Sequence, residues 1–309
     1  MYLLSFQEMF FTHTTDAHNL SVSRFTAGLN CAIMTEPANI SFYNFTAIYP
    51  PDGFCEYQKL GPFNLFNMIL FKEFGNFVIC LLSGVFLGII GIYKSGSNVS
   101  SLILYLYSLI VGYGIMEGIY HATLWNGFGR IGETILKFQQ SLIIVFLANT
   151  AGFSQFYGHH CIFITTILIA GMYPMVTVVL SSAYRNEWIG WLTFDVLWFF
   201  ILSICLEIWK DKDSYKFDQL DAFLQMWYAT GYVVIAYVLW WIDTFHCTYV
   251  LAHLYLHGIW HLLIALAYFY LTTLISCLTA RLANCKPIIT TYPSHRVPLI
   301  LFVKWEKNK

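Results

Sequence analysis

Charged side chains are scarce in this sequence of 309 residues. Asp, Glu, Lys and Arg make up 11% of it, whereas soluble domains contain about 25%. The formal net charge is −1, so the chain lacks the basic surface with which proteins bind nucleic acid. We therefore exclude nucleic acid as a partner, and the low charge content indicates a chain that lies among membrane lipids.

Polar interruptions are rare as well, and long apolar runs take their place. Several runs approach the length of about 20 residues that crosses the hydrocarbon core of a membrane. We predict an all-α membrane protein, a bundle of seven transmembrane helices (64–278), with an N-terminal luminal or exoplasmic segment (1–63) and a C-terminal cytosolic tail (279–309). The predicted spans are 74–93, 101–121, 135–154, 161–181, 188–208, 223–243 and 250–277.

The distribution of Lys and Arg gives the orientation. With the N-terminus outside, ten of these residues lie in inner segments and four in outer segments, while Lys72 and Lys137 lie near span edges. Cytoplasmic loops carry the excess of Lys and Arg in membrane proteins. Glycosylation sequons at Asn19, Asn39 and Asn44 agree with an outer N-terminal segment. We expect a glycoprotein with a luminal N-terminus and a cytosolic C-terminus.

Cysteine is too infrequent for a disulfide-based fold. The chain has 8 cysteines, and most of them lie in predicted spans, where cysteine usually behaves as a small apolar residue. Cys31, Cys55 and Cys247 fall on the outer side, where disulfides persist.

Ionisable residues inside the apolar spans are candidates for function because burying them in lipid is costly. His257 and His261 lie four residues apart, on one face of a helix, and could both bind one zinc ion. His121 ends the second predicted span on the same outer side, which makes a site of three histidines geometrically feasible. The alternative is a chance spacing, with the imidazoles hydrogen-bonded to carbonyls of neighbouring helices.

Several short segments occur in an informative order. They are "GFCEYQ" and "KEFGN" before and at the first span, "GIYHATL" at the end of the second, "WWIDTFHC" after the sixth and "HGIWH" in the seventh. Together they resemble the alkaline ceramidases, which belong to a superfamily of seven-helix membrane hydrolases that includes the adiponectin receptors. The resemblance covers roughly residues 52–275.

The resemblance implies zinc bound by His121, His257 and His261. It implies hydrolysis of the amide bond of ceramide or a related N-acyl sphingolipid, giving sphingosine and a fatty acid. Zinc suits this reaction because it activates water and polarises a carbonyl group. The implied surroundings are membrane lipids of the endoplasmic reticulum or Golgi, with no obligate protein partner.

The sequence departs from the family pattern at two positions near the predicted zinc site. Glu117 stands where the family has serine, four residues before the first histidine, and it is either a fourth ligand or a general base. Gly132 stands where the family has aspartate, and the next residue, Glu133, either orients the water or lies at the membrane surface. Asp243 matches an acidic residue of the family, with either a supporting or a direct role.

The N-terminal segments resemble the calcium site of the family. Glu56 and Glu73 match two of its carboxylates, and Asp52 could replace a third; the alternative is a loop with ordinary carboxylates. Oxygen ligands of this kind suit Ca²⁺. Cys55 and Cys247 match a family pair that forms a disulfide.

Three functions are compatible with these residues and motifs. The first is a zinc-dependent amidase in which Glu117, Glu133 and Asp243 are the candidate catalytic carboxylates. The second is a ceramidase-like lipid-binding or receptor protein that keeps the metal for structure, which Glu117 and Gly132 both favour. The third is a transporter or proton relay that also uses Asp195 and Glu207.

Overall fold

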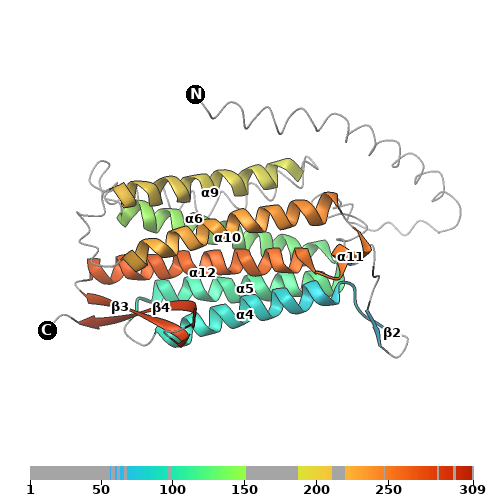
Figure 1. Ribbon diagram of the computed structural model, residues 1–309, viewed down its shortest axis with the longest axis horizontal. Helices are drawn as coiled ribbons and strands as arrows, with labels where there is room; N and C mark the ends of the chain where they lie inside the picture. The colour runs from blue at the N-terminus through green and yellow to red at the C-terminus, as the bar shows by residue number, and fades with distance from the viewer. Residues whose placement is uncertain are drawn as a thin grey trace, which may run out of the picture. The chain divides into compact units, whose positions relative to one another are not determined.

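The computed structural model describes part of the chain, and the described part is mostly helical (Figure 1). The chain divides into two units, Met1–Asn44 and Phe45–Lys309, and all described residues lie in the second. The predicted span 161–181 and nearly all of the N-terminal segment lie outside the described residues. The described residues are 56, 60, 63–65, 68–95, 99–150, 187–210, 220–246, 248–283, 285–294 and 297–307.

Helices form at the six predicted spans that fall within the described residues. Four of these helices are long and apolar enough to cross a membrane. A two-stranded antiparallel sheet precedes the first long helix of the described residues, and a second one follows the last. The helices are α4 (Phe74–Ser95), α5 (Ser101–Thr123), α6 (Asn126–Thr150), α9 (Glu187–Lys210), α10 (Leu220–Phe245), α11 (Tyr249–Ala252) and α12 (Leu256–Leu282); the strands are β1 (Phe63–Leu65), β2 (Met68–Phe71), β3 (Cys285–Ser294) and β4 (Val297–Lys307).

Large apolar side chains cover the outer face of α4. Leu82, Phe86, Ile89 and Tyr93 are all exposed, and their spacing of three or four residues places them on one side of the helix. A soluble protein rarely exposes so continuous an apolar surface, whereas lipid covers it at no cost. The chain is therefore a membrane protein.

Helix α12 occupies the centre of the described helices. It packs against α4, α5, α6 and α10, and Figure 1 shows it running alongside α10 and α5. Most of its apolar length is buried, including its polar residues Thr272, Thr273 and Ser276. This position brings side chains at the start of α12 close to the neighbouring ends of α4 and α5.

Glycines allow α4 and α5 to approach each other closely. A β-carbon built at Gly84 would lie 2.4 Å from the Cα atom of Gly114, and one built at Gly114 would lie 2.6 Å from the Cα atom of Gly84. Small residues at helix crossings permit such backbone contact in membranes. The glycines therefore fix how deeply α4 docks against α5.

Replacing Gly84 with alanine should destabilise the protein by about 1–3 kcal/mol, because the added methyl group forces two backbones apart. Gly231→Ala is the matched control, since a β-carbon there meets no atom within 4 Å. Thermal unfolding in detergent measures both variants. Equal melting temperatures for Gly84→Ala and the unmodified protein would contradict this packing.

Helix α6 begins at Asn126, nine residues before the predicted start of the third span. Three polar residues near the predicted start are buried in the helix: Lys137, Gln139 and Gln140. Lys137 forms an ion pair with Glu133 one turn earlier, and Gln139 Nε2 donates a hydrogen bond of 3.2 Å to the Leu106 carbonyl. These partners satisfy the Lys137 ammonium group and the Gln139 amide nitrogen within the bundle.

A β-hairpin follows the last helix, and the sequence pattern did not predict it. Strands β3 and β4 pair antiparallel from Cys285 opposite Lys307 to Ser294 opposite Val297. Trp305 Nε1 donates a hydrogen bond of 3.1 Å to Ser276 Oγ of α12. The hairpin is thus attached to the central helix at the end opposite its histidines.

Candidate metal centre

An interruption between two helices sets where the histidine-bearing helix begins. The predicted continuous span from residue 250 is wrong here, because α11 ends at Ala252 and α12 starts at Leu256. Tyr255 between them has a φ angle of 49°, a left-handed conformation that interrupts a helix. The Tyr255 ring lies against Gly75, where a β-carbon would approach it to 2.2 Å. His257 is therefore in the first turn of α12, with His261 one turn later.

The three predicted zinc ligands come together. His261 Nε2 lies 3.1 Å from His121 Nε2 and 3.1 Å from His257 Nε2, and the three side chains are buried. One ring nitrogen carries either one hydrogen or one lone pair, so His261 Nε2 cannot serve both neighbours by hydrogen bonding alone. A single tetrahedral ion with bonds of about 2.0–2.1 Å separates its nitrogen ligands by about 3.3 Å. The residues fit zinc.

The opposite ring nitrogens of two histidines are held by oxygen atoms. His121 Nδ1 lies 2.6 Å from Glu73 Oε2, and His261 Nδ1 lies 2.6 Å from Tyr113 Oη. Partners of this kind fix the ring orientation of metal-binding histidines. Both rings consequently present Nε2 to the common centre.

Residues at the start of α4 form hydrogen bonds to both α5 and α12. The Glu73 N–H donates to the His121 carbonyl at 3.0 Å, so Glu73 holds His121 by backbone and side chain. Asn76 Oδ1 accepts a hydrogen bond of 2.9 Å from the Gly258 N–H, and Asn76 Nδ2 donates to Glu73 Oε2 at 3.3 Å. The first turn of α4 thereby sets the distance between the ends of α5 and α12.

The two described residues of the predicted calcium site bind protein groups. Glu56 Oε1 and Oε2 accept hydrogen bonds from the N–H groups of Gly75 at 2.7 Å and Asn76 at 2.9 Å, which caps the start of α4. Burial raises the pKa of Glu56, and these two backbone donors lower it in part. Asp52 lies outside the described residues, and calcium binding stays a prediction. Cys55 and Cys247 also lie outside them, so their disulfide is equally untested.

The three candidate catalytic carboxylates occupy different surroundings. Glu117 is buried on α5, one turn before His121, and a β-carbon at Gly132 of α6 would lie 2.2 Å from its Oε1 atom. Glu133 forms the ion pair with Lys137. Asp243 is buried near the end of α10.

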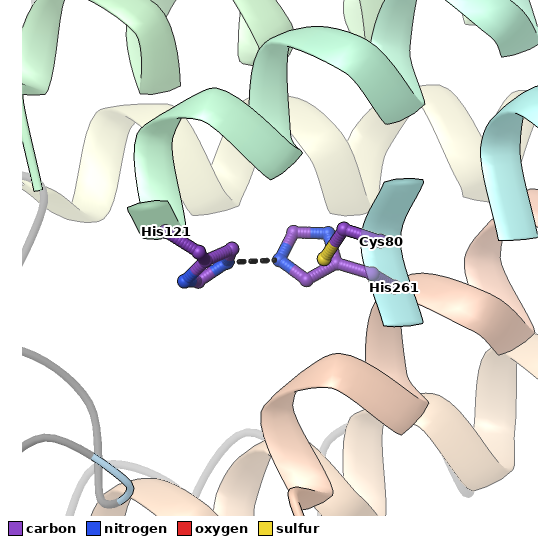
Figure 2. Close-up of side chains that lie close together, drawn as sticks. All are labelled: Cys80, His121 and His261. Carbon is purple, nitrogen blue, oxygen red and sulfur yellow. Dashed lines mark hydrogen bonds between the residues drawn. The ribbon is translucent and has the colours of Figure 1, made fainter. Parts of the chain in front are cut away.

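One further donor atom at the centre was not predicted from the sequence. Cys80 of α4 is buried, and its Sγ atom lies with ring nitrogens of His121 and His261 in a group whose donor atoms are all within 4.8 Å of one another. Figure 2 shows the three side chains, which come from three helices, with a hydrogen bond between the two imidazoles. The available signal was the spacing: Cys80 follows Asn76 by one turn and shares its helix face. This buried group could hold a metal ion.

Replacing Glu73 with glutamine should weaken zinc binding by about 10–100-fold, the usual cost of losing a partner of a metal-binding histidine. The amide keeps the size of the side chain but removes its charge. Competition with a chelator of known affinity measures the change. Glu306→Gln is the matched control because Glu306 is exposed on β4; equal zinc affinity in the two variants would contradict the role of Glu73.

These features define a helical membrane protein with a buried histidine and cysteine site where three helices meet. A model of the ceramidase family matches residues 70–300, which is well over half of the chain. The chain therefore belongs to the ceramidase family, and the resemblance in the sequence motifs is confirmed. A comparison with curated proteins finds no match. Family membership indicates a hydrolase of amide bonds with a ceramide-type lipid as substrate.

Proposed function

We propose that this protein is a zinc-dependent intramembrane amide hydrolase that converts ceramide to sphingosine and a fatty acid. The observation that carries the proposal is the convergence of His121, His257 and His261, with His261 Nε2 at 3.1 Å from both other Nε2 atoms. The site lies among apolar helices, where a two-tailed lipid can reach it without entering water. The chain's membership in the ceramidase family supplies the reaction class.

The protein's side chains would have distinct roles in metal binding and proton transfer. The three histidines hold zinc, and Glu73 and Tyr113 orient two of the rings. When bound, zinc activates water and polarises the amide carbonyl.

Glu117 accepts the proton from water and returns it to the departing nitrogen, while a C–O bond forms and the amide C–N bond breaks. Glu117 suits this role better than Glu133, whose carboxylate is engaged by Lys137. Asp243 supports the site from the end of α10.

The membrane arrangement is part of the same proposal. Seven spans would place the N-terminal segment in the lumen of the endoplasmic reticulum or Golgi and the C-terminal residues in the cytosol. The metal centre would then lie in the luminal half of the bilayer, because His121 ends α5 and His257 starts α12. Glycosylation of the N-terminal sequons, a calcium site at Glu56 and Glu73, and the Cys55–Cys247 disulfide are further parts of it.

A second candidate function is a lipid-binding or receptor-like protein with a structural metal. Cys80 favours it, because its sulfur lies close to ring nitrogens of His121 and His261. Glu117 favours it as well, because it offers a further carboxylate one turn before His121 on α5. A catalytic zinc site keeps one position open, whereas a structural site fills all four with protein ligands. A fourth protein donor would favour this second function unless zinc expands to five-coordinate during the reaction, so hydrolysis of ceramide by the zinc-loaded protein separates the two functions.

Metal analysis of detergent-purified protein, combined with hydrolysis of a panel of fluorescent ceramides, tests the proposal. We expect about one zinc per chain, hydrolysis that stops on chelation, and recovery when zinc is returned. Protein that holds zinc but cleaves no ceramide would support the lipid-binding function. Sustained hydrolysis by zinc-free protein would refute the zinc mechanism.

A further inference from the structure

We infer that Cys80 is a direct metal ligand, so that the resident ion binds one sulfur atom in addition to the histidine nitrogens. The inference deepens the proposed function and rests on it for the presence of a metal. It applies to the enzyme and to the lipid-binding alternative alike, since zinc with four protein donors can expand to five-coordinate during a reaction.

Cys80 lies on the face of α4 that contacts α12. Asn76, one turn earlier on the same face, reaches α12 through its 2.9 Å hydrogen bond from Gly258 N–H. Cys80 continues this face toward the centre and is 1% exposed. Its thiol is free of any disulfide, so the sulfur atom is available to a metal.

The distances between the donor atoms fit a shared metal ion. The Cys80 Sγ atom and ring nitrogens of His121 and His261 all lie within 4.8 Å of one another. In a tetrahedral zinc site, bonds of about 2.3 Å to sulfur and 2.0–2.1 Å to nitrogen place such donors about 3.3–3.6 Å apart. Rotation of short side chains is sufficient to close the remaining gap of about one ångström.

The donor atoms are also of the kinds that zinc prefers. Imidazole and thiolate are the donors that zinc prefers, whereas magnesium and calcium prefer oxygen. A thiol buried in a purely apolar span would select no metal, but this thiol faces two imidazoles. The combination gives a site selective for zinc over the hard cations.

Cobalt substitution tests the inference in the full-length protein in detergent. Co²⁺ bound to a thiolate gives a sulfur-to-cobalt charge-transfer band in the near ultraviolet, which histidine ligands do not produce. We expect the band in the unmodified protein and its loss in Cys80→Ser, which keeps cobalt on its three histidines. Zinc affinity of that variant should fall by at least about tenfold.

Cys277→Ser is the matched control, because Cys277 is equally buried on α12, at 1% exposure, and should keep the band. Bound cobalt without the band, or a band that survives in Cys80→Ser, would overturn the inference while leaving the histidine site intact. Failure to bind cobalt at all would overturn the proposed function as well.

X-ray absorption at the zinc edge covers the case in which Cys80→Ser does not fold. The unmodified protein should show a sulfur shell at about 2.3 Å beside nitrogen at about 2.0–2.1 Å. A spectrum explained by nitrogen and oxygen alone would overturn the inference without any variant.

Discussion

Replacing His261 with alanine should remove bound zinc and lower ceramide hydrolysis by at least about 10³-fold, since the metal supplies several kcal/mol of transition-state stabilisation. The reason is geometric: His261 Nε2 is the atom that lies 3.1 Å from both other ring nitrogens. Without it, the ion loses the ligand that links His121 of α5 to His257 of α12. Zinc content and turnover of the same preparation measure the two effects together.

His253→Ala is the matched control for this experiment. His253 lies on the same stretch of sequence but is exposed, and its Nδ1 donates a hydrogen bond of 2.8 Å to the Tyr249 carbonyl. We expect this variant to keep zinc and activity. If His261→Ala also kept one zinc per chain and full hydrolysis, the three histidines would not be the metal site.

Gly132→Ala should lower hydrolysis by about 10²-fold or more, the usual contribution of a positioned proton-transfer group, while zinc stays bound. An added β-carbon would lie 2.2 Å from Glu117 Oε1 and 2.8 Å from its carboxyl carbon. The carboxylate must then shift away from its present position. Steady-state kinetics and metal analysis of the variant separate loss of the carboxylate from loss of the ion.

Two comparisons identify the cause of that loss. In Gly112→Ala the nearest atom to the new methyl group is 3.6 Å away, so this control should keep full activity. Glu117→Ala/Gly132→Ala should be no less active than Glu117→Ala alone, because the methyl group then meets no carboxylate. Full activity in Gly132→Ala would show that the placement of Glu117 does not matter for the reaction.

The sequence predicted the helices best where apolar residues run without interruption. The predicted spans 74–93 and 101–121 end within two residues of α4 and α5. The third span was predicted to begin at residue 135, with the polar residues Lys137 and Gln139 near its start, whereas α6 begins at Asn126. Gln139 is satisfied by a contact with the Leu106 carbonyl of the neighbouring helix α5. Local pattern does not contain such contacts.

The site was predictable to the extent that its residues have recognisable spacing. Two histidines four residues apart and the family motifs predicted the metal ligands, which the structure places together. Tyr113 and Cys80 were missed because each resembles an ordinary apolar residue of a span. Their role depends on how α4, α5 and α12 are rotated against each other, and packing rather than spacing determines this rotation.

The hydrogen bond between Glu73 and His121 connects the start of α4 to the end of α5. Because α4, α5 and α12 each contribute to the centre, a bound ion would act as a cross-link between segments separated by 140 residues in the chain. Metal binding of this kind adds directly to folding stability. Chelation should therefore loosen the ends of these three helices at the candidate metal centre first, and hydrogen exchange at the Asn76 and Gly258 amides should measure metal occupancy.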